Sequence, residues 1–141
     1  MVNGGFIDQY GNEITEIKYD WIDIFKENRA MIKINDKCGI INEFGNEIIS
    51  FKYNWIYNFH ENKAVVQLNG KYGFIDRDGN EIIECKYDNI WDFNENRVAV
   101  KLNSKWGFID EFGNEIIECK YDDVWNFSNE KALVELNNEE F

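Results

Sequence analysis

The sequence predicts an all-β repeat protein, and three observations support this class. Four units of 34 residues follow one another without insertion or deletion, at residues 5–38, 39–72, 73–106 and 107–140. Short segments alternate apolar and variable residues, which is the period-2 pattern of β-strands. These segments end at glycines and Asn-Gly pairs typical of tight turns, and no window shows the 3.6-residue periodicity of a helix. We therefore treat residues 1–141 as a single repeat domain.

The elements of one unit can be followed from residue 64 to residue 93. A half-buried strand is expected at 64–68, and it ends at Asn69-Gly70, a pair that accepts the positive φ angles of a type I′ hairpin. A second strand covers 72–75 and leads into a turn at 76–79, where Gly79 takes the left-handed position of a G1 bulge. A third strand is expected at 81–85 and a less regular fourth strand at 89–93. Each unit therefore contains three to four short antiparallel strands.

One unit cannot bury both faces of so small a sheet, so neighbouring units must cover each other. Two arrangements satisfy this requirement. We prefer an open β-solenoid or superhelical meander. The alternative is a closed, propeller-like ring in which the last strand pairs with the first.

A family resemblance follows from the motifs shared by the four units. Lys-Trp-Gly-Phe-Ile-Asp at 105–110, Glu-Phe-Gly-Asn-Glu-Ile-Ile at 111–117 and Lys-Tyr-Asp at 120–122 resemble the WG repeat of bacterial proteins. The Trp-Gly pair itself occurs at Trp106-Gly107, while the other units have Cys38-Gly39 and Tyr72-Gly73, and the proline common before Lys-Tyr-Asp is missing. The resemblance implies a β-rich, usually bacterial repeat module without a general enzymatic activity.

Composition excludes several classes of function. A net charge of −12 argues against direct binding of nucleic acid or anionic membrane. No stretch approaches the roughly 20 apolar residues of a membrane span. The N-terminal residues have no signal-peptide character, and three cysteines, an odd number, favour free thiols, so we expect a cytoplasmic protein.

Catalytic and metal sites are not expected either. The single histidine, His60, and the lack of a Cys-x-x-Cys pair argue against zinc, and no serine has a partner histidine in the repeat scheme. The segment 76–80 resembles the start of a calcium loop, but aromatic residues replace Asp78 in the other units. We therefore expect no enzyme activity, no cofactor and no metal.

Negative charge is concentrated in the fourth unit. Residues 107–140 contain ten acidic and two basic residues, a net charge of −8, whereas the other three units together carry −4. One interpretation is a solubilising cap on a terminal repeat. The other is a docking surface for a basic protein, formed by Glu111, Glu118, Asp122 and Asp123 with Trp125 as an apolar anchor.

Aromatic residues suggest a second candidate surface. Trp21 and Trp55 occupy one repeat position, where the later units have polar residues, and Trp91 and Tyr57 occupy a position two residues further on. Strand parity places both positions on one face, so an aromatic strip of Trp21, Trp55, Tyr57 and Trp91 is one hypothesis. The alternative is that these rings pack between repeats.

The three cysteines are predicted to be buried free thiols. Cys85 and Cys119 share a repeat position with Ile17 and Phe51, and Cys38 shares one with Tyr72 and Trp106.

These observations lead to three hypotheses about function. The first is a non-enzymatic protein–protein interaction module. The second is a small acidic inhibitor of a basic protein surface, either a nucleic-acid mimic that blocks a nuclease or defence complex or a toxin-immunity protein. The third is a glycan or cell-wall binder that uses tryptophan platforms. The sequence leaves the oligomeric state open.

Overall fold

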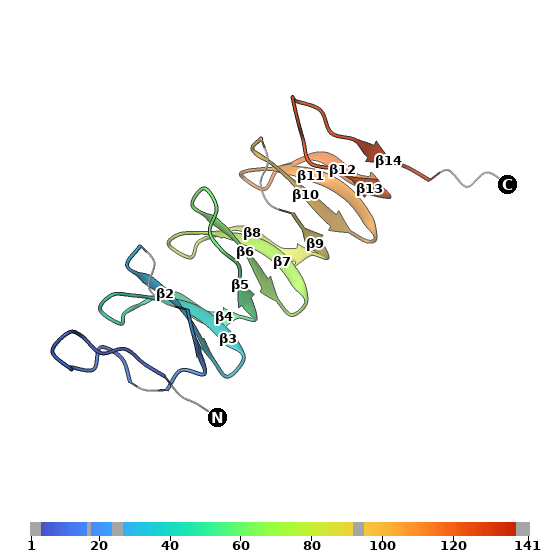
Figure 1. The fold of residues 1–141 in the computed structure, drawn as a ribbon. Coiled ribbons are helices and arrows are strands. Elements are labelled where there is room, and N and C mark those ends of the chain that lie inside the picture. Colours follow the sequence, from blue (N-terminus) through green and yellow to red (C-terminus); the bar gives the residue numbers. More distant parts are fainter. Residues whose placement is uncertain (1–3, 17, 24–26, 92–94, 138–141) are drawn as a thin grey trace. The chain divides into compact units, whose positions relative to one another are not determined.

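The computed structural model describes residues 4–16, 18–23, 27–91 and 95–137. Every regular element in this part of the chain is a β-strand. The strands form four antiparallel sheets, none of which is closed (Figure 1). The all-β class is confirmed, and no sheet in this part of the chain pairs the last strand with the first. The chain divides into two compact units, residues 1–57 and 58–141, and each is described by itself.

The first unit contains one four-stranded sheet with the order β1-β2-β3-β4. Two isolated bridges, Gly4 with Tyr19 and Ile7 with Glu13, form a short hairpin before it. The strands of the unit are β1 (Trp21–Ile22), β2 (Arg29–Ile34), β3 (Lys37–Asn42), β4 (Glu47–Tyr53) and β5 (Trp55–Ile56).

The second unit repeats this pattern. Its strands are β6 (Lys63–Leu68), β7 (Lys71–Asp76), β8 (Glu81–Tyr87), β9 (Asn89–Ile90), β10 (Arg97–Leu102), β11 (Lys105–Asp110), β12 (Glu115–Tyr121), β13 (Asp123–Val124) and β14 (Val134–Glu135). β6, β7 and β8 are consecutive neighbours in one sheet, β9 to β12 form the next, and β13 pairs with β14 in a two-stranded sheet. The fourth strand expected at 89–93 is shorter than predicted, since β9 contains only Asn89–Ile90, and residues 92–94 lie outside the described part.

The sheets are out of phase with the sequence units. In the first complete sheet, β1 and β2 come from the end of unit 5–38, while β3 and β4 come essentially from the start of unit 39–72. The sheet β9–β12 is divided in the same way between units 73–106 and 107–140. Each complete sheet is therefore built from two hairpins that belong to successive sequence units.

The predicted turns are present. Asn69 and Gly70 have φ of 52° and 79°, as a type I′ turn requires, and Gly79 has φ of 86°. The Asp76 carboxylate accepts hydrogen bonds of 2.9 Å from the N–H groups of Asp78 and Asn80, which closes the turn before β8. Tight turns also occur at the other hairpin ends, where Glu61 and Asn62 have φ of 50° and 65°.

A bulge explains the glycine that opens each sequence unit. Between the pairs Tyr72–Tyr87 and Phe74–Ile83, β7 advances two residues while β8 advances four. The extra backbone of β8 passes over Gly73, so a Cβ atom added there would lie 2.3 Å from the Ile83 carbonyl oxygen. A side chain does not fit at this contact.

The strands at the centre of the sheets are buried on both faces. The side chains of Val98 and Val100 on β10 pack with Phe74 of the preceding sheet, whereas Ala99 between them packs with Phe108 and other residues of a second cluster. The prediction of half-buried strands is therefore wrong for the middle of β6 and β10, whose central apolar residues are all buried. For β10 the preceding and following sheets cover the two faces. Stacking of successive sheets builds the core of the second unit.

Candidate interaction surfaces

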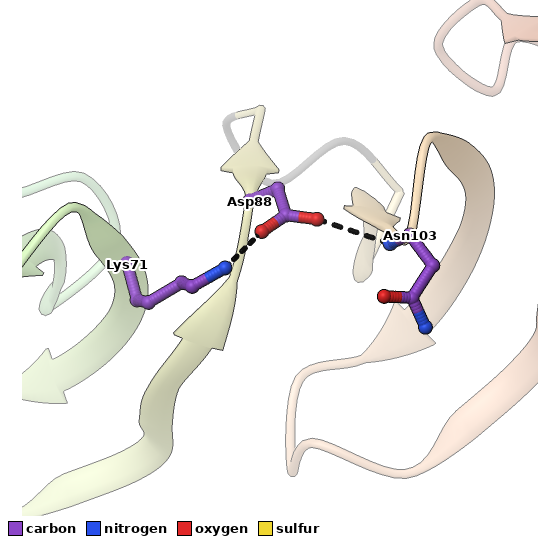
Figure 2. A network of polar contacts seen from close by, with 3 residues as sticks. All are labelled: Lys71, Asp88 and Asn103. Carbon is purple, nitrogen blue, oxygen red and sulfur yellow. Dashed lines mark hydrogen bonds and ion pairs between the residues drawn. The ribbon is translucent and has the colours of Figure 1, made fainter.

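An aspartate links two successive sheets at the corner between β8 and β9. Oδ1 of Asp88 accepts a hydrogen bond from Lys71 Nζ, and Oδ2 accepts one of 3.0 Å from the backbone N–H of Asn103. Figure 2 shows the carboxylate between Lys71 on one sheet and Asn103 in the next hairpin turn. The hydrogen bond from Lys71, helped by that from Asn103, holds the pKa of Asp88 below its ordinary value. We call this arrangement the aspartate clasp.

Asp122, one of the predicted partner-binding residues, forms the same clasp in the fourth unit. Its carboxylate accepts hydrogen bonds from Lys105 Nζ and, at 2.7 Å, from the N–H of Asn137. The Lys105 hydrogen bond lowers the pKa of Asp122 as well. Asp20 accepts a hydrogen bond of 2.8 Å from the N–H of Asn35 at the equivalent position. The side chain of Asp122 therefore has a structural role, and it is already engaged within the fold.

Glu111 and Glu118 lie apart from one another. Glu111 is half-buried in the turn between β11 and β12, whereas Glu118 is exposed on β12. The seven residues of β12, at about 3.3 Å each, separate this turn from the corner at Asp122 by roughly 20 Å. The predicted acidic residues consequently do not form one compact patch.

The surroundings of Glu118 contain both signs of charge. Its Oε1 lies 3.9 Å from Lys120 Nζ. On its other side is a hollow of about 360 Å³, which Glu118 lines together with Glu115, Lys86 and Lys105. The lysines offset part of the negative potential of β12.

Two acidic residues of the fourth unit face each other on β13 and β14. Asp123 and Glu135 are both exposed and lie directly opposite each other in the antiparallel pair. Like charges in this position repel and destabilise a sheet. In the first and third units a lysine faces a neutral residue here, as Lys33 faces Trp21 and Lys101 faces Asn89.

Trp125 lies beside this pair of carboxylates. The backbone N–H of Trp125 donates a hydrogen bond of 2.9 Å to the Leu133 carbonyl oxygen, so strand pairing extends past β13. Trp125 follows β13 two residues beyond Asp123, and it is 42% exposed. We call Asp123, Glu135 and Trp125, which are neighbours along the β13–β14 pair, the β13–β14 acidic face.

The sequence interpretation missed the part played by Glu135. Position 135 is a glutamate where the other units have Lys33, Gln67 and Lys101. That exchange is visible in the sequence, but the pairing with Asp123 follows only from the strand register.

The predicted aromatic strip is only partly assembled. Within the first unit, the rings of Trp21 and Trp55 have centroids 5.3 Å apart, and Lys33 Nζ lies 5.6 Å from the Trp55 centroid. Trp21 is 39% and Tyr57 42% exposed. Trp91 lies elsewhere: it packs in the core, with its ring 4.9 Å from that of Trp106. Trp91 therefore packs against a core cluster, and its ring partner Trp106 belongs to the same sequence unit, 73–106.

The cysteines differ in their exposure. Cys38 is buried, as predicted, and burial raises the pKa of its thiol. Cys85 and Cys119 are half-buried, so the prediction for these two is wrong. They lie on β8 and β12, which are edge strands, and an edge is covered less completely than the middle of a sheet.

Other kinds of site find no support in the described residues. No group of three or more potential metal-ligating His, Cys, Asp or Glu residues occurs among them. The carboxylate of Asp76, in the segment that resembles a calcium loop, is directed at the N–H groups of its own turn. No helix long and apolar enough to cross a bilayer is found there either.

Comparison with known proteins agrees with the repeat architecture. A family model described as WG containing repeat matches four consecutive segments, residues 5–38, 39–72, 72–106 and 106–139. Neither the curated proteins nor the solved structures gave a match.

Proposed function

Because the chain belongs to the WG-containing repeat family, we propose that it is a non-enzymatic protein-interaction module that binds a basic protein through its fourth unit. The family is defined by a repeat and not by a catalytic site. We further propose that the protein is cytoplasmic. Its finer form is an inhibitor whose carboxylates occupy the positions of phosphates in a basic channel of the partner.

The observation that carries this proposal is the pair Asp123–Glu135. A solubilising cap requires polarity, and the lysine found at this position in the first and third units would supply it without repulsion. Two exposed carboxylates on opposed strands instead destabilise the free protein and create a site that a lysine or arginine side chain would neutralise. Trp125 adds an apolar anchor at the same place, as is common at the centre of protein interfaces.

The test gives β13 and β14 the facing residue pair of the third unit. The double variant Asp123→Asn/Glu135→Lys reproduces the pair Asn89–Lys101 and raises the net charge by three. Its matched control is Glu16→Gln/Glu84→Lys, which makes the same change in charge at exposed residues equivalent to Glu118. Glu16 lies 3.6 Å from Lys18, so its surroundings resemble those of Glu118 next to Lys120.

Each protein is immobilised and incubated with a bacterial lysate at low and at high salt, and the bound proteins are identified by mass spectrometry. We expect the wild type and the control to retain basic proteins that Asp123→Asn/Glu135→Lys does not retain. These proteins should dissociate as the salt concentration is raised. Equal binding to the test variant and the control would refute the role of the β13–β14 acidic face.

The pair Trp21–Trp55 supports a second candidate surface. Two adjacent, partly exposed rings with a lysine beside them form a platform that stacks on an apolar peptide side chain or a sugar ring. Binding there would be nearly independent of salt. A partner that is lost from Trp21→Ala but retained by Asp123→Asn/Glu135→Lys would favour this candidate.

A further inference from the structure

The described residues at the two ends of the chain form complementary halves of a sheet. A complete sheet consists of a first hairpin, such as β1–β2, followed by a second hairpin, such as β3–β4. Near the N-terminus, the bridges Gly4–Tyr19 and Ile7–Glu13 have the register of the second hairpin, where Cys38 pairs with Tyr53 and Ile41 with Glu47.

Near the C-terminus, only a first hairpin is present in the described residues. Asp123 pairs with Glu135 and Val124 with Val134, which matches the register of β1 with β2. A two-stranded ribbon is marginally stable by itself and exposes an edge with free backbone groups. In the complete sheets, β2 and β10 use this edge to pair with β3 and β11.

Side-chain exposure differs between these two hairpins and the complete sheets. Ile7 is 61% exposed, whereas its equivalents Ile41, Ile75 and Ile109 are at most 1% exposed. Leu133 is 64% exposed, whereas its equivalents Val65 and Ala99 are 9% and 1% exposed and Met31 is half-buried. Both hairpins therefore expose apolar side chains at positions that the complete sheets cover more fully.

We propose that two copies of this chain associate head to tail, with the β14 edge of one copy pairing antiparallel with residues 4–8 of the next. The register of β2 with β3, carried over to the two ends, places Ala132 opposite Ile7 and Leu133 opposite Phe6. It also places Lys131 opposite Asp8, an attractive pair that matches Lys63 with Asp76 and Arg97 with Asp110 in the complete sheets.

This contact is heterologous, because it joins two different surfaces. It therefore generates chains of copies, or rings if the rotation closes. The inference is independent of the proposed function, since it uses the edge of β14 and needs no basic partner. The dependence on salt distinguishes self-association from binding of a basic protein. Salt screens the repulsion between copies that each carry a net charge of −12, so it strengthens self-association, whereas it weakens binding of a basic protein.

The test uses the full chain in sedimentation velocity over a range of concentrations. We expect the wild type to form oligomers whose size increases with concentration and with salt. Ile7→Asp blocks one end and Leu133→Asp the other, and both side chains are exposed, so neither change disturbs the core. Each single variant is expected to sediment as a monomer.

Mixing the two variants provides the decisive measurement. Ile7→Asp keeps an intact β14 edge, and Leu133→Asp keeps an intact N-terminal hairpin, so an equimolar mixture should form 1:1 dimers and nothing larger. Dimers in the mixture also show that both variants are folded. A wild type that remains monomeric at its highest soluble concentration, a single variant that associates like the wild type, or a mixture without dimers would overturn the proposal.

Discussion

Replacing Gly73 with alanine tests the bulge that defines the repeat. The new Cβ would lie 2.3 Å from the Ile83 carbonyl oxygen and 2.9 Å from the Cys85 nitrogen. Both atoms belong to the backbone of β8, so the strand itself has to move. Forcing a methyl group into a packed site costs typically 1–3 kcal/mol, and a clash with backbone belongs at the upper end, about 3 kcal/mol. About 0.4–1 kcal/mol of this is recovered from the reduced entropy of the unfolded chain.

We therefore expect Gly73→Ala to lower the free energy of unfolding by about 2 kcal/mol. For a unit of about 80 residues this corresponds to a decrease of roughly 10 °C in melting temperature. Circular dichroism during thermal unfolding, supported by urea titration, measures both quantities.

Gly70, three residues earlier, supplies the matched control. It has φ of 79° but no neighbouring atom within 4 Å of an added Cβ, and its equivalent in the next unit, Ser104, has φ of 68°. The left-handed φ costs a serine roughly 1–2 kcal/mol, and about 0.4–1 kcal/mol is recovered from the unfolded chain, so Gly70→Ser should cost about 1 kcal/mol. The explanation fails if Gly73→Ala melts like the wild type, or if Gly70→Ser is equally destabilising.

Two further predictions concern the aspartate clasp and the thiols. The pKa values of Asp88 and Asp122 are lowered on folding, so their stabilisation is complete above the ordinary aspartate pKa of about 3.9 and is lost as the pH falls below it. Asp88→Asn keeps an acceptor for the N–H of Asn103 but removes the charge that binds Lys71. The urea midpoint of the variant should therefore be lower than that of the wild type at about pH 7, and it should depend less on pH between about 5 and 3. An unchanged midpoint and pH profile would contradict the clasp. A thiol reagent should label Cys85 before the buried Cys38 in the folded protein, as followed by mass spectrometry, and the reverse order would contradict the assigned exposures.

The repeat, the strand order along the chain and the turn chemistry could be predicted from the sequence because each depends on local properties. Asn69-Gly70 and Gly79 adopt the positive φ angles expected of them, since few other residues tolerate such angles. The recurrence of the same residues every 34 positions also indicates the family, and the family model confirms it.

The candidate surfaces could be predicted only in part. Composition located the excess of acidic residues in the fourth unit, but it did not distinguish a carboxylate used by the fold from one that is exposed. Asp122 and Asp123 are adjacent in the chain, yet the first binds Lys105 and Asn137, whereas the second accepts a hydrogen bond from its neighbour Val124 and faces Glu135. Likewise the ring of Trp91 packs against that of Trp106, a contact between residues 15 positions apart.

The sequence by itself determined the all-β class, the length of the repeat and the places where the chain turns, because these follow from side-chain periodicity and local backbone preferences. Only the tertiary structure decided the phase of the sheets, which join the end of one unit to the start of the next. A sequence repeat has the same period wherever its boundary is drawn, so hydrogen-bond pairing alone determines which strands share a sheet. That pairing leaves Ile7 and Leu133 more exposed than their equivalents in the complete sheets, and it places Asp123 opposite Glu135.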